Sequence, residues 1–156
     1  MGKQLTVGDE APALVLPTAD GTTVDLADLR GQHVVVYFYP KAGTSGCTTE
    51  ACDFQESLEP LKAAGYAVVG VSPDPAEALT DFAAANGLTF PLVSDTSKET
   101  IDAWGALGEK VKDGKTVLGV IRSTVVVDPD GRVELAAYDV APVGHVADLR
   151  RQLALA

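Results

Sequence analysis

One segment near the start of the chain constrains the fold more than any other. His33–Tyr39 is a continuous run of apolar, β-branched and aromatic residues, which is typical of a β-strand covered on both faces. Pro40–Gly46 follows and cannot continue the strand, and a helical pattern then extends from Cys47 to about Ala64. Because a doubly covered strand needs layers on both sides of its sheet, this segment predicts an α/β fold.

The other segments alternate between strand and helix patterns. Further strands are expected at Ala13–Leu16, Thr22–Leu26, Tyr66–Val71, Phe90–Val93, Val117–Val127 and Arg132–Tyr138. Further helices are expected at Pro75–Asn86, Ser97–Trp104 and His145–Leu155. The order matches a thioredoxin-like fold, with a central mixed β-sheet flanked by helices and an N-terminal β-hairpin. We expect one domain over residues 1–156.

Composition narrows the class of protein. The formal net charge of −10 argues against binding nucleic acid or anionic membranes, since both need a basic surface. No apolar run is long enough to span a membrane and the N-terminus lacks the apolar core of a signal peptide, so we expect a cytoplasmic protein. In that reducing compartment, two cysteines are more often reactive or metal-binding than joined in a permanent bridge.

Helical phase separates the two cysteines. Cys47 shares one helix face with a set of apolar residues, namely Ala51, Phe54, Leu58 and Leu61, so its thiol is expected to point into the domain. Cys52 falls on the opposite, polar face and is expected to look toward water.

The loop before Cys47 places this residue in the first helical turn. Free backbone N–H groups and the positive end of the helix dipole favour an anion there, and therefore the nucleophilic thiolate. Thr44 and Ser45 are good capping residues just upstream, and Gly43 and Gly46 let the backbone approach a small ligand closely.

The spacing of the two cysteines predicts a conformational change. Residues five apart on an intact α-helix have Cα atoms roughly 8–9 Å apart, whereas a disulfide needs less than about 7 Å. Cys47 and Cys52 can therefore bridge only if the helix unwinds locally. Pro60 lies in the same helical pattern and should kink or end it near Glu59.

The residue pattern also allows less specific roles for these side chains. Both cysteines can be ordinary core or surface residues, and a zinc site would need further ligands, while His33 and His145 look structural. Arg122 is the one charge within Val117–Val127 and calls for an anionic partner such as a thiolate, unless its head group reaches the sheet edge.

The segment from Tyr37 to Cys52, YFYPKAGTSGCTTEAC, closely resembles the active-site signature of peroxiredoxins. Its second cysteine, five residues after the first, is similar to the bacterioferritin-comigratory-protein or Q-type subfamily. The segments Trp104–Lys110, Gly119–Thr124 and Val127–Gly131 resemble that subfamily in the same order, so the resemblance covers nearly the whole chain.

The resemblance implies a role for each matching residue. Cys47 would be the peroxidatic thiol and Cys52 the resolving one. Thr44 would bind the peroxide oxygens, Pro40 would shield the thiolate and the peroxide from water, and Arg122 would stabilise the thiolate and polarise the O–O bond.

The resemblance also implies the reaction and its partners. A hydroperoxide would oxidise Cys47 to a sulfenic acid, Cys52 would close an intramolecular disulfide, and thioredoxin or a similar dithiol would reduce it, with no metal or cofactor. Ser45 departs from the proline of many members. Only two cysteines exist, which excludes the intersubunit disulfide of the typical two-cysteine class, and the subfamily is often monomeric.

Two other classes of thiol protein place different demands on the sequence. A thiol–disulfide oxidoreductase on the same fold would need a C-x-x-C motif, which the sequence lacks. A non-enzymatic redox sensor would signal through the Cys47–Cys52 disulfide and would not need the peroxide pocket that Thr44 and Arg122 imply.

Overall fold

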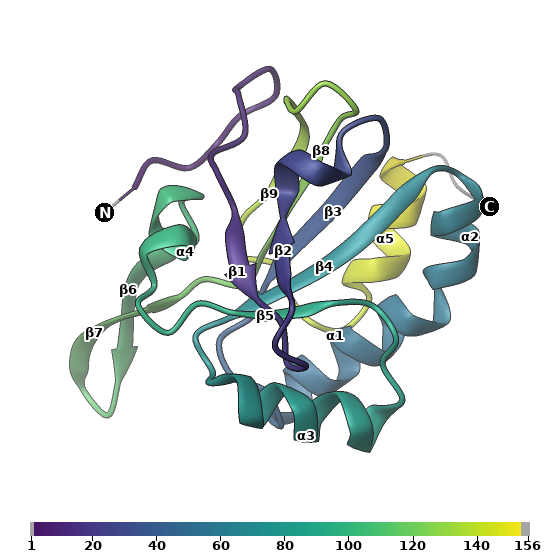
Figure 1. Cartoon of the computed structure of the whole chain (residues 1–156). Helices are drawn as coiled ribbons and strands as arrows, with labels where there is room; N and C mark the ends of the chain where they lie inside the picture. Colours follow the sequence, from purple (N-terminus) through teal and green to yellow (C-terminus); the bar gives the residue numbers. More distant parts are fainter. Residues whose placement is uncertain (1, 154–156) are drawn as a thin grey trace.

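The computed structural model describes residues 2–153, and its centre is a mixed five-stranded sheet in the order β5-β4-β3-β8-β9 (Figure 1). The strands are β3 His33–Phe38, β4 Tyr66–Ser72, β5 Leu92–Ser94, β8 Ser123–Val127 and β9 Val133–Ala137. β3 pairs parallel with β4 and antiparallel with β8, so it lies in the middle of the sheet. Its central place explains the continuous apolar run, because both of its faces are covered.

The two faces of the sheet carry separate hydrophobic cores. Val35 and Tyr37 point to a core shared with four helices, α1 Ser45–Glu56, α2 Leu58–Ala63, α3 Ala76–Asn86 and α5 His145–Gln152. Val34 and Val36 point to the opposite core, which β1 Val15–Pro17 and α4 Glu99–Ala103 help to cover. The predicted layered α/β arrangement is confirmed.

The predicted N-terminal hairpin is also confirmed. β1 pairs antiparallel with β2 Thr23–Asp25, and a short 3-10 helix, η1 Leu26–Leu29, leads from it into the sheet.

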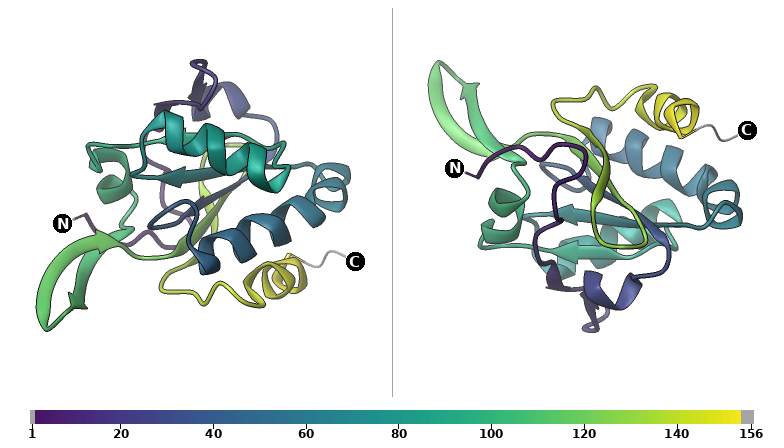
Figure 2. Two further views of the ribbon diagram at one scale, coloured as in Figure 1. Left: turned by 90° about the horizontal axis from the view of Figure 1, so that it is seen from below. Right: turned by 90° about the horizontal axis from the view of Figure 1, so that it is seen from above.

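The prediction of one strand over Val117–Val127 is wrong. The chain forms β7 Lys115–Val120 and β8, which belong to different sheets and are separated by Ile121 and Arg122. β7 pairs with β6 Leu107–Lys112, a strand that the sequence pattern did not reveal, and the two form an arm that projects from the body (Figures 1 and 2). Two apolar runs in succession look like one strand when their pairing partners are unknown.

The long helix expected after Cys47 is divided into α1 and α2 at Ser57. Pro60 is the third residue of α2, where a missing N–H costs no helical hydrogen bond. Its ring would clash with the carbonyl of Glu56 in a continuous helix, so the break falls slightly earlier than the expected position near Glu59.

The remaining elements agree with the sequence pattern to within a few residues at their ends. The last residues of the helix predicted over His145–Leu155 lie outside the described part of the chain. Among residues 2–153, no helix combines the length and the hydropathy needed to cross a bilayer.

Candidate active site

Cys47 lies where the sequence places it, in the first turn of α1. The helix begins at Ser45, with Thr44 as its N-cap residue, and its first backbone bond runs from the amide of Thr48 to the carbonyl of Thr44 at 2.9 Å. The Cys47 side chain is only 1% exposed and packs in the core of the helical face. The thiol therefore lies against apolar side chains in the first helical turn, where the helix dipole favours an anion.

Arg122 provides a positive charge to this sulfur. Its Nη2 donates to Cys47 Sγ at 3.2 Å, and its Nη1 donates to Glu50 Oε1 at 2.7 Å. The residue lies in the short link between β7 and β8, and backbone hydrogen bonds fix this link. The amide of Ile121 donates to Ala106, and the carbonyl of Arg122 accepts from Val140. The guanidinium lies inside the site, hydrogen-bonded to Cys47 and Glu50, and does not reach a sheet edge.

Glu50 is the site residue that sequence reasoning missed. It lies one turn after Cys47 on the inward face of α1, and its side chain is fully buried. Burial raises the pKa of its carboxyl group to about 7, although the neighbouring Arg122 acts in the opposite direction. An acidic residue on the apolar stripe that contains Cys47 and Ala51 was the signal that could have revealed it.

Cys52 lies on the other side of α1 and is half-buried, so the expectation that it faces water is only partly met. Its Sγ donates to Asn86 Oδ1 on α3 at 3.8 Å. The structure has both thiols free, and they are held apart by the intact helix, as the spacing predicts.

Thr44 does not cap the helix with its side chain, which corrects the capping prediction. Its hydroxyl donates to the carbonyl of Lys41 at 2.8 Å, so its oxygen lone pairs remain available to accept from a ligand. Gly46 lies close to Arg122, because a Cβ there would stand 3.3 Å from Nη2. Pro40 is half-buried at the start of the same loop.

Neither histidine is hydrogen-bonded to Cys47 in the described contacts. His33 contacts Glu134 and stacks on Tyr66, and His145 bonds Thr124 at 2.7 Å, with its pKa lowered by burial. Within the part of the chain that the structure describes, no three metal-binding side chains are grouped as a metal site would require.

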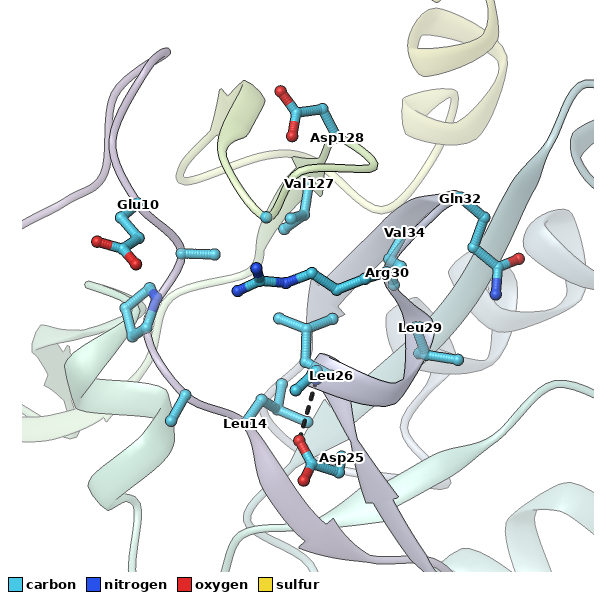
Figure 3. Close-up of a pocket in the computed structure, with 15 residues that line it drawn as sticks. Glu10, Leu14, Asp25, Leu26, Leu29, Arg30, Gln32, Val34, Val127 and Asp128 are labelled. Carbon is cyan, nitrogen blue, oxygen red and sulfur yellow. Dashed lines mark hydrogen bonds between the residues drawn. The ribbon is translucent and has the colours of Figure 1, made fainter.

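A separate cavity of about 260 Å³ lies at the opposite end of β3 and β8, where Val34 and Val127 line it (Figure 3). Arg30 extends into it, with Glu10, Asp25 and Asp128 around its border. No cysteine lines this cavity, so it is not part of the thiol site.

Comparison with known proteins agrees with the geometry of the thiol site. The model of the AhpC/TSA family matches residues 7–136. The chain belongs to this family. It is 58% identical over 152 residues to a putative peroxiredoxin of Mycobacterium tuberculosis, covering 97% of each chain. It is also 43% identical over 141 residues to peroxiredoxin Bcp of Escherichia coli, covering 90% of each chain.

Solved structures place this peroxiredoxin in the Q-type subfamily. Peroxiredoxin Q of Xylella fastidiosa has a TM-score of 0.91 at 32% identity, with 98% of each chain covered. The bacterioferritin comigratory protein of Xanthomonas campestris, whose structures were described for alkyl peroxide reduction, has a TM-score of 0.86 at 38% identity, with 90% of each chain covered. The thioredoxin-like fold and the enzymatic class, a thiol peroxidase that consumes peroxide and a thiol reductant, are therefore those predicted from the sequence.

Proposed function

We propose that Cys47 is the thiol that attacks the hydroperoxide and that Cys52 resolves the product. The contact between Cys47 Sγ and Arg122 Nη2 at 3.2 Å carries this assignment, because it pairs a buried thiol with a fixed cation. A buried thiolate without such a partner would be strongly disfavoured by desolvation.

The first step uses the loop and the start of α1. The Cys47 thiolate attacks the terminal oxygen of the peroxide, an S–O bond forms and the O–O bond breaks. The alkoxide or hydroxide that leaves takes up one proton and becomes alcohol or water. Thr44 can accept from the peroxide O–H, since its own hydrogen is directed at Lys41. Arg122 stabilises charge in the transition state, and Gly46 keeps the backbone open beside it. Pro40 would keep water away.

The second step requires α1 to open. Cys52 lies on the opposite face of the helix, so its sulfur reaches the Cys47 sulfenic acid only after the first turns unwind. The thiol then condenses with the sulfenic acid, releasing water and leaving an intramolecular disulfide.

The identity of the reductant and the state of the protein in the cell complete the proposal. We infer a thioredoxin-like dithiol as reductant, both hydrogen peroxide and organic hydroperoxides as substrates, a monomer, and a cytoplasmic location. The alkyl peroxide reduction described for the Xanthomonas relative supports organic hydroperoxides as substrates, and the pair Cys47 and Cys52 supports an intramolecular disulfide that a dithiol can reduce.

Intact mass spectrometry after one equivalent of peroxide tests both cysteine roles. We expect wild type to lose two hydrogens and Cys52→Ser to gain one oxygen, while Cys47→Ser stays unchanged and consumes no peroxide. Peroxide consumption by Cys47→Ser at the wild-type rate would contradict the proposal.

The redox-sensor alternative predicts a different steady state. With thioredoxin, its reductase and NADPH present, an enzyme turns over continuously, whereas a sensor is oxidised once and stops. Continuous NADPH oxidation that depends on Cys52 supports the enzyme.

A further inference from the structure

Arg122 is shared by two acidic groups that compete for its charge. One amino group of its guanidinium donates to Cys47 Sγ and the other to Glu50 Oε1, and its side chain is only 13% exposed. If the thiol and the carboxyl were both ionised, this buried site would hold two negative charges against one positive charge. Such an excess is costly where water is excluded, so the two ionisations must be coupled.

The surroundings of Glu50 favour its neutral form. Its Oε2 is buried and has no hydrogen-bond partner among the described residues, as expected more of a protonated acid than of a carboxylate. Arg122 is the cation beside it, while Asp53 on the same helix acts on it as a further negative charge. Burial, helped by the charge of Asp53, outweighs Arg122 and raises the pKa of Glu50 to about 7.

The other ionisable groups near the pair do not replace Glu50 in this role. Tyr37 and Tyr39 on the sheet side are buried, and burial raises the pKa of both hydroxyls, so they stay neutral near pH 7. Lys110 on the arm and His145 on α5 lie within electrostatic range of Arg122, and burial lowers the pKa of each. Neither is hydrogen-bonded to Glu50 in the described contacts.

We propose that Glu50 carries a proton while Cys47 is a thiolate and releases it when the sulfur becomes a neutral sulfenic acid, so that Arg122 always faces one negative charge. Glu50 is then a positioning residue that acts through Arg122. This inference rests on the proposed function of Cys47.

The exchange balances the proton that the peroxide reaction consumes. The thiolate takes one oxygen from the hydroperoxide, the sulfur is oxidised by two electrons and the O–O bond is reduced, and the alkoxide that leaves takes up one proton. At the same stage Glu50 loses one proton, so thiolate, hydroperoxide and carboxylic acid become sulfenic acid, alcohol and carboxylate with no net proton uptake. The buried site therefore holds one negative charge beside Arg122 throughout: on Cys47 before the step and on Glu50 after it.

Proton uptake in a single turnover tests the exchange. Reduced Cys52→Ser protein, which stops at the sulfenic acid, is mixed with one equivalent of hydrogen peroxide in weak buffer near pH 7 with a pH indicator. The same measurement is made with Glu50→Gln added, because glutamine keeps an oxygen for Arg122 but cannot ionise. We expect the doubly substituted protein to take up at least about half a proton more per peroxide than its Cys52→Ser parent.

The ionisation of Cys47 gives a second readout. We expect Glu50→Gln to speed the alkylation of Cys47 by iodoacetamide near pH 7, since the competing carboxylate is removed. Glu56→Gln is the matched control, because Glu56 is exposed on the same helix, and it should change neither readout.

The outcomes separate this inference from the proposed function. If Cys47 is not the peroxidatic thiol, peroxide adds no oxygen to the Cys52→Ser protein. If oxygen is added but proton uptake and the alkylation rate are the same with glutamate and glutamine, the role of Glu50 is overturned. Should Glu50→Gln fail to fold, infrared difference spectra of Cys52→Ser decide: the carbonyl band of a protonated carboxylic acid must disappear on oxidation, and its persistence refutes the exchange.

Discussion

Arg122 shows how much of this site depends on the reach of single side chains. It lies 75 residues from Cys47 and 72 from Glu50 in sequence, and its two amino groups contact both. Burial and Cys47 act in opposite directions on this guanidinium, and the net effect is to raise its pKa, so it stays charged throughout the working pH range.

Replacing Arg122 tests the cation directly. We expect Arg122→Met to lower kcat/KM for hydrogen peroxide by ~100-fold or more, because the charge that stabilises the thiolate and the transition state is lost. The kcat/KM of Arg122→Lys should lie between those of wild type and Arg122→Met, since one ammonium cannot make both contacts of the guanidinium. Arg151→Met, which removes an exposed ion pair on α5, is the control and should leave the rate unchanged. An Arg122→Met enzyme with wild-type kcat/KM would refute the assignment.

Gly46 tests the packing around the guanidinium. A Cβ at Gly46 would stand 3.1 Å from Pro142 Cγ and 3.3 Å from Arg122 Nη2, so Gly46→Ala must displace one of them slightly. We expect a loss of roughly 10-fold in kcat/KM, with thermal stability unchanged or higher, because alanine favours a helix more than glycine does. Ser45→Ala, exposed in the same turn, should have no such effect. Equal rates for both variants would show that the site tolerates the added methyl group.

At the scale of elements, α1 combines two demands that conflict. It must be intact to place Cys47 at its N-terminus, and it must open for Cys52 to reach Cys47. The helix is short because Ser57 separates it from α2, and the side chain of Gln55 bonds Thr89 after α3 at 2.8 and 2.9 Å. The C-terminal end of α1 is therefore anchored, and the N-terminal turns are the part that can unwind.

Hydrogen exchange measures this opening. We expect amides in the first turns of α1 to exchange faster in the disulfide form than in the reduced form, while amides of β3 do not change, because the sheet takes no part in the closure. Peroxide-treated Cys52→Ser, which cannot form the bridge, should keep the reduced pattern. Unchanged protection of α1 in the disulfide form would rule out local unwinding.

At the scale of the whole molecule, a buried acid makes stability depend on pH. The pKa of Glu50 is raised to about 7 in the folded protein, from about 4.3 when unfolded. The contribution of such an acid to the stability of the fold is fully present at pH values below its unfolded pKa. This contribution is lost as the pH rises through the folded pKa.

Denaturation across pH checks this dependence. We expect the unfolding free energy of reduced wild type to fall, relative to Glu50→Gln, as pH rises from about 4.5 to 7, by on the order of 3 kcal/mol. Glu56→Gln should follow wild type, since its carboxylate is exposed. Parallel curves for wild type and Glu50→Gln would show that Glu50 ionises normally when buried.

The sequence alone was enough for the layered fold and for half of the site. The apolar run of β3 required that both faces of this strand be covered, and the loop Pro40–Gly46 required that the strand end and a helix begin. Helical phase put Cys47 on the inward face and Cys52 on the opposite face. These conclusions depend on local periodicity, which can be read directly from consecutive residues in the sequence. The N-terminal hairpin was predicted for the same reason.

Tertiary structure alone decided the remaining half. It ended one strand at β7 and began another at β8, and it brought Arg122 between Cys47 and Glu50. β7 pairs with its neighbour β6 across the turn at Asp113 and Gly114, whereas β8 pairs with β3 far away in the chain. Pairing with a distant strand leaves little trace in either strand's own sequence pattern. The charge of Glu50 follows the same logic, since its ionisation depends on how completely the fold removes water from around it.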